Sequence, residues 1–223
     1  MTKVCIVTGF TPIPDHPRSE LEYHAWGSRF TEVAGEHSRV FYDTPLKNCW
    51  LQNWLDTRSD KHDFIVSRGD NPNKNTIAYH AVQHQKTEWL KLATMADDNA
   101  DTFVWMDYGI FHQPGVTAAV ISDFLKRVRP NDFAIPGCWN PKDGVRLDQS
   151  MPNWRFCGSL AIVPRQYVVE FDALVKMTTK ARVRFLNHLT WEVNDWADVE
   201  LMKKLPIRWY EADHNEKQFT NYV

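Results

Sequence analysis

The sequence predicts one α/β domain with a mostly parallel, twisted sheet and helices on both faces, in a Rossmann-like arrangement. Two observations lead to this fold class. Short runs rich in β-branched residues alternate along the chain with longer segments in which apolar residues recur every three or four positions. The 223 residues suit one domain with a full core, and no repeat, low-complexity tract or linker divides them. We therefore expect residues 1–223 to fold as a single domain.

The individual elements follow from local patterns. Gly9, Pro12 and Pro14 mark a loop after the first expected strand. Asn75 or Thr76 can cap the clearest helix, which the Asp97–Asn99 segment ends. Strands are expected at residues 3–8, 40–42, 64–66, 102–106, 133–136 and 160–163, and helices at residues 19–34, 76–96, 116–128 and about 191–205.

Composition limits the partners and the compartment. The 26 Lys and Arg residues against 28 Asp and Glu residues give a net charge of -2, so no overall field favours nucleic acid or an anionic membrane. The four cysteines stand singly, without a CxxC pair or the Cys/His spacing of structural zinc sites. No apolar run reaches the roughly 20 residues of a membrane span, and no signal-peptide region opens the chain. We expect free thiols and a cytoplasmic location.

Asp107 is the first candidate for a functional residue. It follows the apolar strand 102–106, where a carboxylate at the sheet edge can hold a cation or a sugar hydroxyl, although a strand-ending Asp is often only a turn former. The sequence has no P-loop, no G-x-G-x-x-G after its first strand and no G-x-S-x-G elbow. Gly109 also breaks the D-x-D-x-[TV] pattern of haloacid dehalogenase phosphatases.

Two further clusters could carry chemistry. Four carboxylates lie in the segment 191–201, and helix-dipole stabilisation accounts for only one or two of them. Trp191 and Trp196 in the same segment suggest a surface that faces a substrate. Near the C-terminus, His214 lies beside carboxylates and could bind a metal, although most lone histidines are exposed or satisfied locally.

Taken together, these segments resemble the bacterial HtrL/YibB family and, more widely, nucleotide-sugar glycosyltransferases of the GT-A fold. The most specific match is the run from Val104 to Ile110, which is similar to the family's apolar-Trp-apolar-Asp-x-Gly core. The other matching residues are Ile6–Phe10, Arg18–Tyr23, Val40–Asp43, Tyr79, Lys86 and the late acidic step Asp198–Glu200.

The resemblance implies a donor site. In GT-A enzymes the first strand and its loop cradle the nucleotide base, a place that Thr8, Gly9 and Phe10 would take. A D-x-D motif holds ribose and a divalent metal, a place that Asp107 would take with Gly109 where the second carboxylate should be.

The diphosphate leaving group gains negative charge and requires a cation. Either Lys86 and Arg18 supply it, or Asp107 and His214 hold Mg²⁺ or Mn²⁺, the option we favour slightly.

The expected activity is transfer of a sugar from a nucleotide-sugar donor, above all a UDP-sugar, to a glycan or another hydroxyl acceptor. For an inverting reaction, Asp198 is the first candidate base, with Glu192 and Asp195 behind it. One alternative is a nucleotide-sugar-binding protein that has lost catalysis. Another is a glycosyltransferase that modifies hydroxymethylated bases in DNA through a surface at Lys126, Arg127 and Arg129, which the balanced net charge disfavours.

Overall fold

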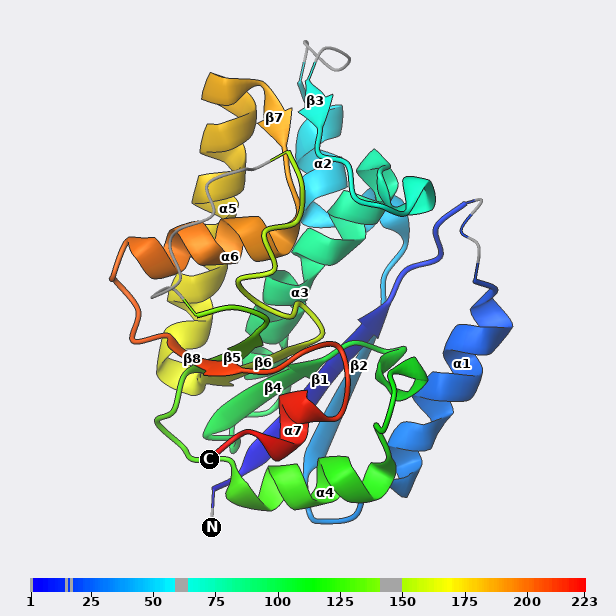
Figure 1. The fold of residues 1–223 in the computed structure, drawn as a ribbon, viewed down its shortest axis with the longest axis vertical. Helices are drawn as coiled ribbons and strands as arrows, with labels where there is room; N and C mark the ends of the chain where they lie inside the picture. The colour runs from blue at the N-terminus through cyan, green and yellow to red at the C-terminus, as the bar shows by residue number, and fades with distance from the viewer. Residues whose placement is uncertain (1, 15, 17, 59–63, 141–149) are drawn as a thin grey trace.

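A six-stranded sheet forms the centre of the computed structural model, which describes residues 2–14, 16, 18–58, 64–140 and 150–223 (Figure 1). The strand order is β2-β1-β4-β6-β5-β8. Only β6, among the described strands of this sheet, runs antiparallel to its neighbours. The sheet is therefore mostly parallel, as predicted. The strands are β1 (Val4–Phe10), β2 (Ser38–Asp43), β4 (Thr102–Met106), β5 (Ala134–Gly137), β6 (Leu160–Pro164) and β8 (Arg208–Glu211).

Helices cover both faces of this sheet (Figure 1). One face carries α3 (Ile77–Ala96), α5 (Arg165–Leu186) and α6 (Glu192–Leu201), and the opposite face carries α1 (Glu20–Ser28), α4 (Ala118–Arg127) and α7 (Lys217–Thr220). Successive side chains of a strand point to opposite faces, so Phe103 and Trp105 join the first core while Val104 and Met106 join the second. Both halves of the core are thus built from the same strands.

Smaller elements complete the chain. Helix α2 (Trp50–Asp56) packs against α3, and β3 (Ile65–Val66) pairs with β7 (His188–Leu189) in a separate two-stranded sheet. The predicted strand 64–66 therefore exists but lies outside the main sheet. Four short 3₁₀ helices are η1 (Arg29–Glu32), η2 (Leu46–Asn48), η3 (Pro72–Lys74) and η4 (Ile110–His112).

Helix starts agree closely with the capping signals. Thr76 caps α3 by accepting a hydrogen bond from the Tyr79 amide at 3.1 Å. Ser19 and Glu22 form a capping box at the start of α1. The helix expected at residues 19–34 is shorter than predicted, because α1 ends at Ser28 and continues as the 3₁₀ helix η1.

Two expectations about the C-terminal half are wrong or incomplete. The 22-residue helix α5 was not expected, because its buried face includes Asp172, Thr179 and Arg182, which interrupt the apolar periodicity. Trp196 does not face a substrate, since its side chain is fully buried and its ring packs against Phe171.

Among the described residues, no helix is long and apolar enough to cross a bilayer.

Asp132 ties the C-terminal segment to the sheet. Its carboxylate accepts hydrogen bonds from Arg208, the first residue of β8, at 2.9 and 2.6 Å, from Arg129 at 2.7 Å and from the Tyr222 hydroxyl at 2.9 Å. Burial opposes ionisation here, but these donors outweigh it and lower the pKa of Asp132 from 3.8 to about 2.

Replacing Asp132 by Asn is expected to destabilise the fold in a pH-dependent way. Because the folded pKa lies below the unfolded value, the carboxylate stabilises the fold above about pH 3.8 and loses this effect as the pH falls through about 2. Urea unfolding should show a lower free energy of unfolding for Asp132→Asn at pH 7, and a smaller difference at pH 3. Asp123→Asn, which removes an exposed pair with Lys126, is the control and should change little. An equal loss at both pH values would contradict the assignment.

Candidate active site

A cavity of about 400 Å³ lies at the carboxyl ends of β1 and β4. Adjacent parallel strands end at the same edge of a sheet, which is where open α/β folds place their ligands. Aromatic rings provide much of the apolar wall, and charged side chains reach in from α3, α6 and the loops. The lining includes Phe10, His16, Arg18, Tyr23, Lys74, Tyr79, Lys86, Asp107, Gly109, His112, Trp154, Gly158, Trp191, Glu192 and His214.

Asp107 is held firmly at the end of β4. Its amide donates to the Ser159 carbonyl at 3.0 Å, and Oδ1 accepts from Trp105 Nε1 at 3.0 Å. The Lys86 ammonium lies 3.1 Å from the same oxygen. About a third of the side chain (34%) remains exposed, so the carboxylate is oriented by protein contacts and still accessible from the cavity.

Lys86 forms the charged centre of the cavity wall. The residue is 3% exposed, and its Nζ donates to the Gly158 carbonyl and to Glu192 Oε1, both at 2.9 Å. Burial lowers the pKa of Lys86, but the Asp107 and Glu192 carboxylates more than offset it, so the pKa stands above its ordinary value. An ammonium has three N–H donors, and three acceptors surround this one. Lys86 therefore positions its neighbours and has no donor left for a ligand.

Glu192 is buried at the first turn of α6. Burial raises the pKa of this carboxyl, but the Lys86 ammonium outweighs the effect and holds the pKa below its ordinary value. Its second oxygen, Oε2, is buried and has no hydrogen-bond partner in the described part of the chain. With Asp107, two carboxylates share one ammonium, which leaves this part of the wall with a net charge of -1.

Close contacts at Gly158 and Gly109 leave little room for a side chain. A Cβ at Gly158 would lie 2.2 Å from Glu192 Oε1, so a side chain there would displace the carboxylate. A Cβ at Gly109 would lie 3.1 Å from Tyr23 Cε1 and 3.4 Å from Trp26 Cε3. The place of the second acid of a D-x-D motif therefore lies against two aromatic rings of α1.

Fixed cations line the same cavity. The Arg18 guanidinium stacks 5.4 Å from the Trp26 ring centroid, and its Nη1 lies 3.4 Å from His112 Nε2. Lys74 Nζ lies 5.8 Å from the Tyr79 ring, and burial together with Arg18 lowers its pKa. Burial also lowers the pKa of His112, so its imidazole is neutral at pH 7. Arg18 and Lys74 are thus the side chains that bring positive charge to a ligand here.

Most of the sequence-predicted donor residues come together around this cavity. Gly9, Phe10, Arg18, Lys86, Asp107 and Gly109 all line it. Thr8 does not belong to the lining: its side chain is buried beneath the surface of the cavity, without a hydrogen-bond partner in the described structure. His214 also lines the cavity, but its side chain lies beside Cys138 and Cys157.

Of the three candidate bases, only Glu192 lines the cavity. Asp195 is fully buried and accepts from His84 at 2.9 Å, Thr179 at 2.7 Å and Arg182 at 3.1 Å. Asp198 pairs with Arg182, and burial raises its pKa. Both carboxylates contact Arg182 of α5 and neither lines the cavity, so they contribute to the packing of α6 against α5.

The basic residues considered for a DNA surface are also occupied elsewhere. Lys126 pairs with Asp123, Arg127 donates to the carbonyls of Phe219 and Tyr222, and Arg129 pairs with Asp132. None of the three lines the cavity.

Several lining residues were missed by sequence reasoning. Lys74 and His16 lie in turn-rich segments without periodicity, and Gly158 carries no chemical signal of its own. Only the position of Lys74, shortly before the helix cap at Thr76, could have indicated that it reaches the same sheet edge.

Comparison with known proteins identifies structures with a similar fold. No family model and no curated protein matches the sequence. The structure is similar to a glycosyltransferase involved in the glycosylation of the major capsid of PBCV-1, with a TM-score of 0.51, 12% sequence identity, and coverage of 95% of this chain and 81% of that one. A more distant likeness is mouse xyloside xylosyltransferase 1 in its apo form, with a TM-score of 0.40, 8% identity, and coverage of 95% and 85%. The chain thus has a glycosyltransferase-like fold of the GT-A type, while membership of the HtrL/YibB family stays a prediction.

Replacing Gly109 by Asp tests why the second carboxylate is missing. The longer side chain must displace Tyr23, whose ring packs 5.3 Å from Phe10 and 5.5 Å from Trp26, so the melting temperature should fall by several degrees. Gly109→Ala should cost less, because only its Cβ meets the ring. Calorimetric titration should find no tighter Mn²⁺ binding in Gly109→Asp than in the wild type. A stable variant that gains Mn²⁺ binding would refute this explanation.

Proposed function

We propose that this chain is a glycosyltransferase that moves a sugar from a nucleotide-sugar donor, a UDP-sugar, to a hydroxyl acceptor. The observation that carries the proposal is Asp107, a carboxylate fixed by Trp105 and Lys86 at the end of β4 and open to the cavity. The cavity volume of about 400 Å³ falls in the roughly 300–1,000 Å³ range of small-molecule sites. The glycosyltransferase-like fold supports the same activity.

The donor would bind between aromatic and charged side chains. Phe10, Tyr79 and Trp191 belong to the cavity lining and would supply apolar contacts for the base and the sugar. Asp107 accepts hydrogen bonds from ribose hydroxyls, a role that requires only one carboxylate. Arg18 and Lys74 bring positive charge to the diphosphate, which becomes more negative as its bond to the sugar breaks. Arg18 thus keeps its expected role, and Lys74 replaces Lys86 as its partner.

A divalent metal between Asp107 and His214 fits these residues poorly. Mg²⁺ and Mn²⁺ prefer several oxygen ligands, whereas Asp107 Oδ1 already accepts from Lys86 and Trp105, which leaves Oδ2 to supply one. The position of a second acid is taken by Gly109, whose Cβ would lie 3.1 Å from Tyr23 Cε1. His214 lies with two thiols, which are soft ligands. We therefore propose that fixed cations stabilise the leaving group.

Glu192 is the proposed base for an inverting transfer. Its Oε2 is buried and has no hydrogen-bond partner among the described residues, so Glu192 would accept the proton of the acceptor hydroxyl only after the side chain turns towards the cavity it lines. The hydroxyl oxygen then forms its bond to the anomeric carbon, the bond from that carbon to the diphosphate oxygen breaks, and the electron pair leaves with the diphosphate. Glu192 is ionised when this begins, because Lys86 lowers its pKa.

Donor binding is expected to stabilise the protein. At a donor concentration of about 100 times Kd, binding adds about 2.7 kcal/mol, which in a chain of this size raises Tm by roughly 5–10 °C. Thermal-shift assays with a panel of nucleotide sugars measure this effect, and Asp107→Asn should abolish it. Asp98→Asn, an exposed carboxylate just beyond α3, is the matched control. No shift with any donor would count against the proposal.

The variant Glu192→Gln separates catalysis from binding. We expect kcat to fall about 10²–10⁴-fold, the range of general acid–base catalysis, while the donor-induced thermal shift is retained. Donor turnover is followed by release of the nucleoside diphosphate with a panel of sugar acceptors. If Glu192 only supports the structure, binding and turnover will fall together. Donor binding by the wild type without any transfer or hydrolysis would favour the inactive nucleotide-sugar-binding protein.

A further inference from the structure

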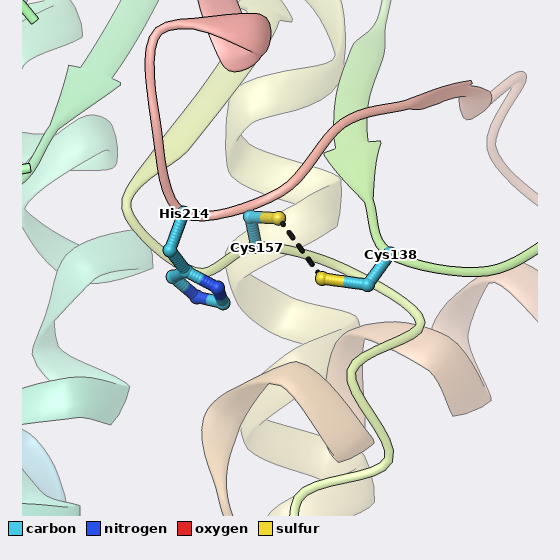
Figure 2. Close-up of side chains that lie close together, drawn as sticks. All are labelled: Cys138, Cys157 and His214. Atoms are coloured by element: carbon cyan, nitrogen blue, oxygen red, sulfur yellow. Dashed lines mark hydrogen bonds between the residues drawn. The ribbon is translucent and has the colours of Figure 1, made fainter. Parts of the chain in front are cut away.

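Three potential metal ligands lie close together in the structure, although they are far apart in the sequence (Figure 2). Cys138 follows β5, Cys157 lies shortly before β6, and His214 follows β8. Their ligand atoms all lie within 4.8 Å of one another, and the two sulfur atoms are 3.6 Å apart. The cysteines that stand singly in the sequence are thus paired by the fold.

The distance between the sulfur atoms distinguishes two kinds of chemistry. A disulfide requires an S–S bond of about 2.05 Å. Two thiolates on one tetrahedral zinc ion, each with a Zn–S bond of about 2.3 Å, are about 3.8 Å apart. The observed 3.6 Å excludes a disulfide and fits either two thiols in hydrogen-bond contact or two thiolates on one zinc ion, so the case for zinc rests on the third ligand, His214. Two sulfurs and an imidazole are also the ligands that zinc prefers over magnesium or manganese.

The backbone sets these positions without a metal. The Cys157 amide donates to the Pro136 carbonyl at 2.7 Å, and the Cys138 amide donates to the Trp154 carbonyl at 3.1 Å. The Trp154 ring packs against His214, with ring centroids 4.8 Å apart. The ligands are therefore held in place by contacts outside the cluster.

Asp213 lies beside the cluster, next to two of its members. Its Oδ1 lies 3.8 Å from Cys138 Sγ and 3.4 Å from His214 Nδ1. Cys157 is fully buried, whereas Cys138 is accessible to solvent, so an ion can enter from the Cys138 side.

We infer that Cys138, Cys157 and His214 bind one Zn²⁺ ion as three protein ligands of a tetrahedral site, with water in the fourth position. The ion would fasten the segments after β5, before β6 and after β8 to one another. Since His214 and Trp154 line the cavity, this site would hold part of the cavity wall in place. The inference rests on the three converging side chains alone and does not depend on the proposed transferase activity.

Metal analysis of the full-length chain, purified without chelators and under reducing conditions, tests the inference. We expect about one zinc per chain and a higher Tm with Zn²⁺ than after dialysis against a chelator. Replacement by Co²⁺ should give the intense visible bands of a tetrahedral site and a thiolate-to-cobalt charge-transfer band. These readouts require no donor sugar, so failure here leaves the transferase proposal untouched.

Variants identify the ligands. Cys138→Ser and His214→Ala should each weaken zinc binding by more than the roughly 10–100-fold that loss of an outer-shell partner costs, and Cys138→Ser should remove the charge-transfer contribution of its sulfur. Cys49→Ala, a buried thiol outside the cluster, is the matched control and should bind zinc as the wild type does.

Three results would overturn the inference: a folded, reduced wild type that binds neither Zn²⁺ nor Co²⁺ at micromolar concentration, zinc binding that survives the double variant Cys138→Ser/His214→Ala, or a Cys138–Cys157 disulfide whose reduction yields no metal binding.

Discussion

The site is organised by one buried ammonium group. Lys86 of α3 is 3% exposed, and a buried charge is tolerated only when it is paired and hydrogen-bonded. Its three acceptors come from the end of β4, the start of α6 and the loop at Gly158, so three segments must meet where α3 places Nζ. The same contact aims Asp107 at the cavity and keeps Glu192 ionised. Loss of the ammonium would leave the Asp107 and Glu192 carboxylates facing each other at low dielectric. The geometry of the site and the local fold therefore both depend on Lys86.

Aromatic packing limits the space beside the Asp107 carboxylate. Tyr23 and Trp26 of α1 lie against Gly109, so α1 closes the position from which a second acid would reach a metal. The first turn of α1 is fixed by the Ser19 capping box, which in turn places Arg18 beside Trp26. The Arg18 cation and the aromatic rings of Tyr23 and Trp26 are therefore positioned by the same helix and its cap. Under the proposed function, such a site would meet a diphosphate with fixed charges and a ribose with a single carboxylate.

The sequence predicted the parts of the fold that depend on local patterns. The capped helix at α3 and the apolar strand before Asp107 were found because periodicity and capping are short-range properties. Helix α5 was not predicted, because the polar residues Asp172 and Arg182 occupy its buried face and interrupt the apolar pattern. Ion pairs satisfy both residues in the folded structure. The late carboxylates could not be placed from the sequence for a related reason: α6 turns Asp195 and Asp198 towards α5, and only packing reveals which side of a helix faces a cavity.

The position of His214 bears on both the zinc inference and the question of a metal at Asp107. A histidine bound to zinc between two thiolates has no lone pair left for a second metal, so the zinc inference removes the remaining nitrogen ligand from a Mn²⁺ or Mg²⁺ site at Asp107. Asp107, with one oxygen engaged by Lys86, would then lack the nitrogen ligand expected of such a site. Under the proposed function, the positive charge that a departing nucleoside diphosphate needs would come from Arg18 and Lys74. The zinc inference and the proposal of fixed cations at the donor site thus both depend on the placement of His214.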